Sequence, residues 1–407
     1  MQLDDADPLA EFRDDFCIPP GVTYFDGNSL GLMTAASSRT IQRVVTEWKE
    51  KGIHGWLDGD HPWITFAERI GEQMSGLVGA APDEVIATGT TTVNLHTLVG
   101  AFYQPGDGRT RILADRLTFP SDIYALHGQV RLKGLDPKDH LSFVESVDDR
   151  VLDEKTIIDM MTPDTALALL PSVIYRSGQL LDVERLTQAA NDRGIIIGFD
   201  CSHSVGAVPH YFDDWGVDFA FWCSYKYLNG GPGATAFLYL NSSYFDRTPG
   251  LPGWFGFRKE HQFDMLTEFD HERSAAGWQI SSPGMLSMAP LEESLALIKR
   301  AGIAAIRGKS LRMTSYLMFL LDETVPDSYG FRVSTPRETT ARGGHVAIEH
   351  EAAPRVFDEL TRSGVTADLR PPNVIRLCPS PLYNRYTEVW DVVEKLKSIG
   401  DRLGPRP

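Results

Sequence analysis

The sequence reads Phe219-Ala-Phe-Trp-Cys-Ser-Tyr-Lys-Tyr-Leu-Asn-Gly-Gly-Pro-Gly233 near the middle of the chain. Its apolar beginning predicts a buried strand, and the glycines at its end predict a tight loop. Lys226 falls between two tyrosines just after that strand. Burial at such a position disfavours the ammonium form, and the remaining amine can attack a carbonyl group.

A second strand with a charged end lies upstream. The run Ile195-Ile-Ile-Gly-Phe-Asp200 ends on a carboxylate and is followed by Cys201-Ser-His203. Taken alone, a lysine is usually a surface charge and an aspartate at a strand end is usually a cap or a turn former. Together, Lys226 and Asp200 are the pair that a pyridoxal phosphate enzyme needs, an amine for the aldehyde and a carboxylate for the pyridine nitrogen.

Composition argues against several classes of protein. The chain has 407 residues, of which 42% are hydrophobic, enough for a large core and for two or so domains. Its formal net charge of −16 disfavours nucleic acids and anionic membranes as partners. The N-terminus lacks the features of a signal peptide, and no apolar run reaches the length of about 18 residues that a bilayer requires, so we expect a cytoplasmic location. Four cysteines without metal-ligand spacing predict reduced thiols and no metal site.

Short apolar runs alternate with helical periods up to about residue 285. The predicted strands are Glu84–Thr88, Arg111–Asp115, Leu141–Val144, Ala166–Leu170, Ile195–Asp200, Val217–Cys223 and Thr235–Leu240. Helix signals lie between many of them, for example at 182–194, with an aspartate cap at one end and a glycine stop at the other. This alternation predicts an α/β fold whose mostly parallel sheet is covered by helices on both faces. Ligands of such sheets bind beyond the carboxyl ends of the strands, where Asp200 falls.

The pattern changes after about residue 285. Helical periods at 291–301 and 310–324 are followed by short strands at 344–349 and 374–377. This order predicts a second, smaller α+β domain. We expect residues 1–60 to form an N-terminal segment that contributes to the small domain, 61–285 to form the large cofactor-binding domain, and 286–407 to form the small domain.

A candidate phosphate site follows the first predicted strand. The run Gly89-Thr-Thr-Thr-Val-Asn-Leu-His96 leads into an apolar helix, and a helix N-terminus offers free N–H groups to an anion. Thr91 and Thr92 could add hydroxyl donors, although threonines are also ordinary helix caps. Phe119 follows the next strand and could stack on a planar ring or pack as a loop residue, and Asp122 could bind the cofactor or cap a helix.

The chain resembles the kynureninases, which are fold-type-I pyridoxal phosphate enzymes related to the class V aminotransferases, from about Tyr24 to Tyr386. The resemblance rests on the order and spacing of the runs Phe25-Asp-Gly-Asn-Ser-Leu-Gly31, Thr92-Val-Asn-Leu-His96, Phe119-Pro-Ser-Asp122, Gly198-Phe-Asp200, His203-Ser-Val-Gly206, Asp214-Trp-Gly-Val-Asp-Phe-Ala220, Trp222-Cys-Ser-Tyr-Lys-Tyr-Leu-Asn229, Gly253-Trp-Phe-Gly256, Asn373 to Arg376 and Pro381-Leu-Tyr-Asn384. It implies a large domain with a mostly parallel seven-stranded sheet and a smaller α+β domain.

The resemblance assigns roles to individual residues. Lys226 would hold pyridoxal phosphate covalently and act as the base, Asp200 would pair with its pyridine nitrogen, and Tyr225 would be a candidate proton shuttle. Ser172 is included because Pro171 stands where a hydrogen-bonding residue is common. The expected cofactor-binding residues are Thr91, Thr92, Phe119, Asp122, Ser172, Asp200, His203, Tyr225, Lys226, Trp254 and Ser282. The expected substrate-binding residues are Ser29, Trp56, Ser282 and Arg376, with Arg376 binding the α-carboxylate.

The implied reaction is the hydrolysis of L-kynurenine to anthranilate and L-alanine by cleavage of the Cβ–Cγ bond, as in tryptophan catabolism. Trp56 stands where animal members have histidine, and Ser281-Ser-Pro283 stands where they often have asparagine. Both features look more like bacterial enzymes that act on unsubstituted kynurenine. Alternatively, both are packing residues, which leaves 3-hydroxykynurenine or a modified kynurenine of a specialised pathway open.

Two further classes compete with this interpretation. A cysteine desulfurase would need a reactive cysteine on a mobile loop, whereas Cys378 falls in Ile375-Arg-Leu-Cys-Pro379, which is typical of a packed strand end. A non-catalytic relative would be expected to have lost Lys226 or Asp200. Through the family we also expect a homodimer with a shared active site, in which Trp56, Thr90 and Trp254 lie near the subunit boundary and Trp254 reaches the partner's phosphate.

Overall fold

A seven-stranded sheet forms the centre of the computed structural model, which describes residues 2–404. The strand order is β2-β8-β7-β6-β5-β3-β4; β8 is antiparallel to both of its neighbours and the other pairs are parallel. The strands are β2 (Val85–Ala87), β3 (Arg111–Asp115), β4 (Leu141–Val144), β5 (Thr165–Pro171), β6 (Ile196–Asp200), β7 (Phe219–Trp222) and β8 (Phe237–Leu240). Each of the seven predicted strands lies in this sheet, which confirms the predicted fold class.

Close packing between strands explains the pattern of the central sequence. All four residues of β7 are buried, as expected for a strand covered on both faces. Gly198 in β6 lies opposite Phe219, and a Cβ atom at this glycine would come within 2.0 Å of the Phe219 ring. The sheet therefore requires a glycine beside the aromatic strand that leads to Lys226.

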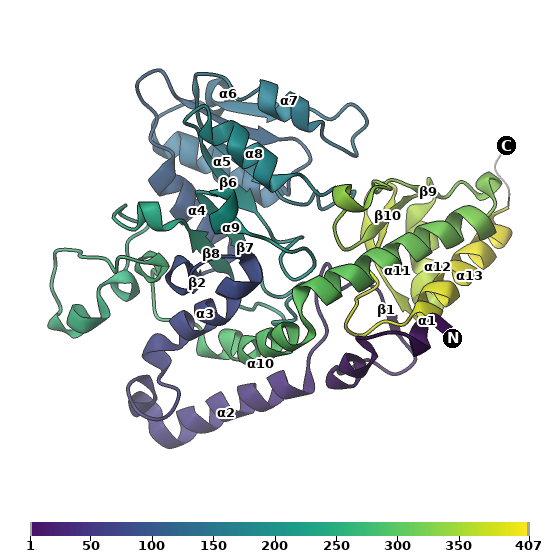
Figure 1. The fold of residues 1–407 in the computed structure, drawn as a ribbon, viewed down its shortest axis with the longest axis horizontal. Coiled ribbons are helices and arrows are strands. Elements are labelled where there is room, and N and C mark those ends of the chain that lie inside the picture. The colour runs from purple at the N-terminus through teal and green to yellow at the C-terminus, as the bar shows by residue number, and fades with distance from the viewer. Residues whose placement is uncertain (1, 405–407) are drawn as a thin grey trace.

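Helices cover both faces of the large sheet (Figure 1). Asp182 caps α8 by accepting a hydrogen bond from the Arg185 N–H at 3.0 Å, as predicted. In the region up to residue 302 the helices are α1 (Gln2–Asp5), α2 (Ala35–Lys51), α3 (Phe66–Val78), α4 (Thr91–Phe102), α5 (Pro120–Leu132), α6 (Pro137–His140), α7 (Glu154–Asp159), α8 (Val183–Asn191), α9 (Phe212–Trp215) and α10 (Met285–Ala301). Within residues 2–404, none of the helices combines the length and the apolar character that a membrane crossing needs.

The C-terminal part of the chain forms a second sheet with its own buried core. This antiparallel sheet has the order β12-β13-β10-β9, with β9 (Arg332–Val333), β10 (Val346–Glu349), β12 (Asp368–Arg370) and β13 (Val374–Leu377). The helices α11 (Ile303–Thr324), α12 (Ala353–Arg362) and α13 (Tyr386–Leu403) pack with it. The N-terminal strand β1 (Thr23–Tyr24) pairs with β11 (Val365–Thr366). The domain boundaries at residues 60 and 285 stay a prediction.

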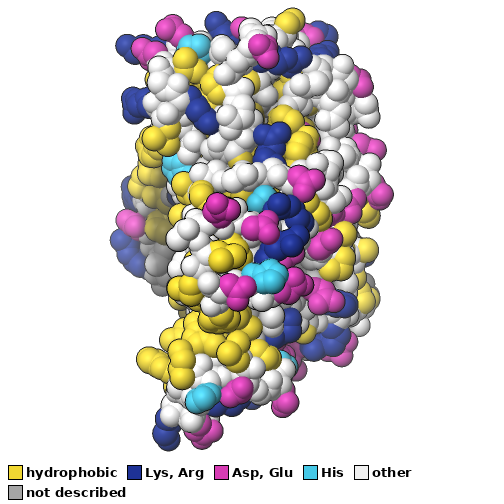
Figure 2. Space-filling model, turned by 90° about the vertical axis from the view of Figure 1, so that its left-hand side faces the viewer, with side chains coloured by type: hydrophobic (Ala, Val, Ile, Leu, Met, Phe, Trp, Pro, Cys, Tyr) yellow, Lys and Arg dark blue, Asp and Glu magenta, His cyan; other side chains and the backbone are white. Residues whose placement is uncertain are grey.

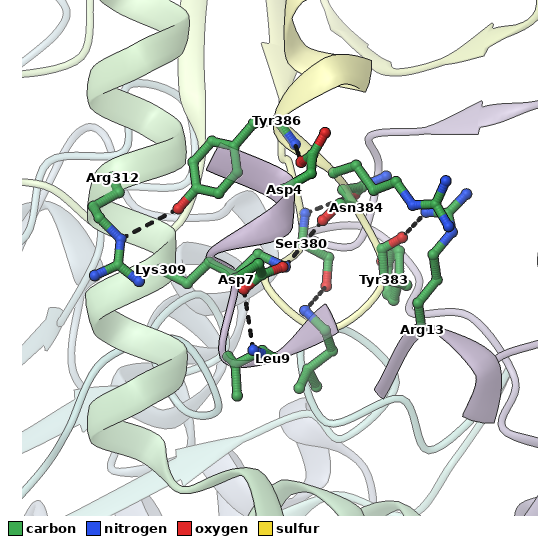
Figure 3. A network of polar contacts seen from close by, with 12 residues as sticks. Asp4, Asp7, Leu9, Arg13, Lys309, Arg312, Ser380, Tyr383, Asn384 and Tyr386 are labelled. Carbon is green, nitrogen blue, oxygen red and sulfur yellow. Dashed lines mark hydrogen bonds and ion pairs between the residues drawn. The ribbon is translucent and has the colours of Figure 1, made fainter. Parts of the chain in front are cut away.

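Polar contacts fasten the N-terminal residues to this C-terminal part (Figure 3). Lys309 of α11 pairs with Asp7 at 2.6 Å, and their side chains are only 2% and 3% exposed. Lys309 also donates to the Asn384 carbonyl at 3.0 Å. Asp4 accepts hydrogen bonds from the first N–H groups of α13, where a negative charge is favoured by the helix dipole. The N-terminal segment is therefore an integral part of the fold.

The buried ion pair predicts a specific loss of stability. Asp7→Ala should lower the free energy of unfolding by about 3 kcal/mol, because it leaves the ammonium group of Lys309 buried without its carboxylate. Urea denaturation at pH 7 measures this change. The control is Asp5→Ala, which removes an exposed carboxylate two residues away, at the end of α1, and should change stability by less than about 0.5 kcal/mol. Equal midpoints for the two variants would contradict the role of the pair.

Candidate active site

The carboxyl ends of the parallel strands border a cavity of about 380 Å³. Small-molecule sites typically have volumes of about 300 to 1,000 Å³. The position is the one expected for a ligand of a parallel sheet. Nine of the predicted site residues line the cavity, namely Ser29, Thr91, Thr92, Phe119, Asp122, Asp200, His203, Tyr225 and Lys226. The structure therefore brings together residues from distant parts of the sequence.

Lys226 lies in a tight turn beyond the end of β7. The turn returns through Asn229, Gly231 and Gly233, all with positive φ angles, which explains the glycine-rich sequence. Gly31 packs directly on this loop: its N–H donates to the Tyr225 carbonyl at 2.7 Å, and a Cβ atom there would lie 2.3 Å from the Lys226 carbonyl oxygen. The N-terminal segment thereby fixes the backbone that carries the lysine.

The amine of Lys226 contacts a buried imidazole, with 2.9 Å between Lys226 Nζ and His203 Nε2. Burial, followed by the neighbouring cations Lys226 and Arg376, holds the pKa of His203 well below its ordinary value. His203 is therefore neutral at neutral pH. With its proton on Nδ1, it accepts a hydrogen bond from the lysine at Nε2.

Two carboxyl-bearing residues, Asp200 and Asp122, line the cavity. Asp200 ends β6 and accepts a hydrogen bond from the Ser202 N–H at 2.8 Å. Burial, followed by the nearby Asp200, raises the pKa of Asp122 well above its ordinary value. The raised pKa favours the protonated form of Asp122, which can donate a hydrogen bond to Asp200. In this pair Asp122 is the hydrogen-bond donor and Asp200 is the acceptor.

The N-terminus of α4 forms another part of the wall. The first N–H groups of a helix have no acceptor within the helix. Thr90 Oγ1 accepts the Val93 N–H at 3.5 Å, and Thr91 and Thr92, the first two residues of the helix, line the cavity. These donors and the helix dipole fit the phosphate of pyridoxal phosphate. The buried carboxylate of Asp200 and the amine of Lys226 on the same cavity fit its pyridine nitrogen and its aldehyde.

Tyr225 lies beside the lysine and lines the same cavity. Burial, followed by the neighbouring Cys223, raises the pKa of the Tyr225 hydroxyl above its ordinary value. The phenol is therefore protonated at neutral pH and can donate a hydrogen bond. This property suits both a phosphate contact and a proton donor, so its predicted shuttle role stays a prediction.

Five predicted site residues do not line the cavity. Ser172 lies behind it, where its N–H and hydroxyl both contact the Asp200 carbonyl, at 2.9 and 3.2 Å. Arg376 is fully buried and donates to Ser29 Oγ, which does line the cavity, at 3.1 Å. The other three lie elsewhere on the surface of the chain, and they are Trp56, Trp254 and Ser282. Their assignment to the site stays a prediction.

Several lining residues were not identified from the sequence. Tyr175 follows the end of β5, so its position after a predicted strand was a usable signal. Arg370 lies on β12, whose three residues are too few to show a strand period. The other lining residues that were not assigned to the cofactor or the substrate are Thr90, Ser121, Pro171, Val173 and Ser202.

Solved structures with the same architecture confirm the class of fold. The apo structure of a cysteine desulfurase from Thermococcus onnurineus NA1 matches 96% of this chain and 98% of its own with a TM-score of 0.80 and 18% identity. A variant of the protein C-DES with glycine covalently linked to its PLP cofactor matches 93% of this chain and 97% of its own with a TM-score of 0.79 and 15% identity. The chain thus has the fold-type-I architecture of PLP-dependent enzymes.

Sequence relatives identify the family within this class. Residues 306–396 match the family described as the kynureninase C-terminal domain. Kynureninase from Geobacillus thermodenitrificans is 52% identical over 98% of this chain and 93% of its own length, and kynureninase from Bacillus thuringiensis is 51% identical over the same shares. The chain belongs to the kynureninase family, as the motifs in its sequence predicted.

Asp115, the last residue of β3, is expected to make the stability of the protein depend on pH. Burial raises the pKa of Asp115 to about 7, so the folded chain holds a proton that the unfolded chain loses near its ordinary pKa of 3.8. Unfolding therefore releases a proton between these values, and this residue's contribution to stability falls as the pH rises from about 4 to 7. Asp115→Asn cannot ionise and should gain stability relative to the unchanged chain over this window, on a scale of about 1.4 kcal/mol per pKa unit. Urea denaturation across the window measures the difference; parallel pH profiles would contradict it.

Proposed function

We propose that the protein uses pyridoxal phosphate to hydrolyse L-kynurenine to anthranilate and L-alanine. The observation that carries the proposal is the placement of Lys226, Asp200 and the N-terminus of α4 on one cavity. Membership of the kynureninase family, with about 50% identity along 98% of the chain, supports this substrate.

The residues around the cavity suit the parts of the cofactor. Lys226 would hold its aldehyde carbon, Asp200 its pyridine nitrogen, and Thr91 and Thr92 its phosphate. Phe119, which is 42% exposed at the cavity, would stack on the ring. Bound pyridoxal phosphate supplies an electron sink for negative charge at the substrate α-carbon.

The chain itself supplies proton transfer and positioning. Lys226 Nζ is the base for the proton on the substrate α-carbon, and His203 Nε2, at 2.9 Å, orients this amine. One water adds to the γ-carbonyl carbon of the substrate before the Cβ–Cγ bond breaks. The γ-carbon and its aryl group then leave together as the aryl carboxylate anthranilate. Tyr225, which keeps its hydroxyl proton, is the candidate donor beside the lysine.

The fold of the solved neighbours does not favour the cysteine desulfurase alternative, because identities of 15–18% show the fold alone. Cys378 is buried to 1% exposure, its Sγ lies 3.5 Å from the Gly344 carbonyl oxygen, and burial raises its pKa to about 12. A buried, protonated thiol is a poor nucleophile. The environment of Cys378 therefore does not support its use as the reactive cysteine of a desulfurase.

Turnover tests the proposed reaction. The protein loaded with pyridoxal phosphate should convert L-kynurenine to equal amounts of anthranilate and L-alanine. Fluorescence measures the anthranilate that forms. Lys226→Ala should lower kcat by about 100-fold to 10,000-fold and remove the absorbance band of the bound cofactor. Lys138→Ala, at an exposed position, is the control. Parallel assays with 3-hydroxy-L-kynurenine rank the two substrates. Cofactor binding without any product from either would contradict the proposed reaction.

We also propose that the active enzyme is a homodimer with a shared site. Figure 2 shows hydrophobic side chains gathered in the lower part of the face that points left in Figure 1. Within the segment 251–269 the exposed apolar residues are Leu251, Trp254, Phe263, Met265, Leu266 and Phe269. Such a surface is typical of a protein interface.

The three predicted site residues away from the cavity support the same proposal. Trp56 and Trp254 both pack on Phe255, with ring centroids 5.8 Å apart in each case. Ser282 follows Ile280 by two residues, and the Ile280 backbone packs against Gly253, the residue before Trp254. One chain therefore carries a cavity and, separately, a group of predicted site residues, as expected if each site takes residues from two chains.

Complementation tests the shared site. Co-expression of a Lys226→Ala chain with a Trp254→Ala chain should restore activity to about one quarter of normal, because half of the dimers are mixed and each mixed dimer has one intact site. Differently tagged chains allow the mixed dimer to be isolated, and sedimentation gives its mass. Activity no higher than the average of the two separate variants would contradict a site built from both chains.

A further inference from the structure

A small cavity lies beside the loop that carries Lys226. Its volume is about 20 Å³, and its wall combines residues of the lysine loop, the N-terminal segment, α11 and the loop after β13. It shares no lining residue with the larger cavity at the strand ends. A water molecule needs about 10–15 Å³, so this cavity has room for one. The side chains with hydroxyl groups at its wall are Tyr227, Ser310, Ser380 and Tyr383.

Two of these hydroxyl groups are buried without a partner. Among the described residues, neither Tyr227 Oη nor Ser310 Oγ has a hydrogen-bond partner. Ser310 belongs to the first half of α11 and is 1% exposed. Nearly all buried polar groups in proteins are bonded to another protein group or to ordered water. The two hydroxyl groups therefore indicate that the cavity they both line holds a hydrogen-bonding molecule.

The chemistry of the wall selects a neutral molecule that can both accept and donate. Burial, followed by the neighbouring Cys378, raises the pKa of Tyr227 well above its ordinary value, so its hydroxyl is a donor at neutral pH. The Cys378 thiol donates elsewhere, to the Gly344 carbonyl at 3.5 Å. Ser310 Oγ can donate or accept. Within the described part of the chain, no charged side chain lines this cavity, so an ion would lack a counter-charge there.

Glycines leave the space beside the hydroxyl groups. Gly27 and Gly344 line the cavity, and neither has a positive φ angle, so their backbone conformations do not require glycine. A Cβ atom at Gly344 would lie 3.2 Å from Tyr227 Oη, and one at Gly27 would lie 2.5 Å from Tyr383 Oη. Any larger residue at either position would therefore crowd a hydroxyl group of the wall.

We propose that this cavity is a binding site for one water molecule, which accepts a hydrogen bond from Tyr227 and donates one to Ser310. The water joins the residue after Lys226 to α11. The lysine loop is thus supported twice, by the backbone contact of Gly31 with the Tyr225 carbonyl and by this water. The proposal is independent of the proposed reaction, because the site requires neither cofactor nor substrate.

A crystal structure of the protein loaded with pyridoxal phosphate, at a resolution that shows ordered water, tests the site directly. We expect a density peak within about 3.2 Å of both Tyr227 Oη and Ser310 Oγ. A cavity without a peak, or a direct bond between the two hydroxyl groups, would overturn the proposal. The double variant Tyr227→Phe/Ser310→Ala should lack the peak. A peak that persists there would show that other groups bind the water.

Urea denaturation tests whether the two hydroxyl groups act through one molecule. Tyr227→Phe and Ser310→Ala should each lower the ratio of folded to unfolded protein about tenfold, and the double variant should lose clearly less than the product of the two factors. Thr324→Ala is the control, because Thr324 ends α11 about 21 Å along the helix from Ser310. Its loss should multiply with that of Tyr227→Phe. Losses that multiply in both pairs would contradict a shared water.

Hydrogen exchange measures the support that the water gives to the lysine loop. In the loaded protein, the double variant should exchange the backbone amides of residues 225–230 about tenfold faster or more, while α8 exchanges at its normal rate. Thr324→Ala should leave exchange in the loop unchanged. Equal exchange of the loop in the unchanged protein and the double variant would overturn the role of the water in holding it.

Discussion

A guanidinium without exposure to solvent stands where three parts of the chain meet. Arg376 is 0% exposed, and a buried charge is stable only when it is paired and its donors are satisfied. Its partners are Asp368 of β12, the Tyr175 carbonyl beyond β5, and Ser29 of the N-terminal segment. The need to satisfy this one side chain joins the two sheets and the N-terminal segment. The cavity therefore acquires its wall only when all three parts are in place.

The N-terminal segment transmits this arrangement to the lysine. Phe25 exchanges backbone hydrogen bonds of 2.8 Å with Thr366 and Cys378, which fix the segment to the C-terminal strands. Six residues later, Gly31 contacts the loop that carries Lys226 through the Tyr225 carbonyl. Because no larger side chain fits at Gly31, the backbones are in direct contact and a shift of one moves the other. The position of the lysine thus depends on residues far from it in the sequence.

The long apolar strands of the large sheet could be predicted from the sequence, because β5 to β8 are buried along most of their length and show as apolar runs. Motif spacing likewise placed Lys226, Asp200 and Thr91 on one cavity. The short strands β1, β9, β11 and β12 could not be predicted, because two or three residues show no period and their pairing comes from distant segments. Arg370 was missed for this reason. Trp56, Trp254 and Ser282 lie away from the cavity of their own chain, and their assignment to the site stays a prediction.

The charge that faces the cavity is opposite in sign to the net charge of the whole chain. The formal net charge is −16, yet Lys226, Arg370 and the N-terminus of α4 all present positive charge to the cavity. Burial raises the pKa of Asp122, which favours its uncharged form and so reduces the negative charge that would weaken this field. Charges act more strongly between low-dielectric walls than at the surface, where salt and water screen them. A ligand with anionic groups, such as a phosphate or a carboxylate, is therefore attracted by the cavity and not by the rest of the surface. Net charge alone would have pointed to the opposite preference.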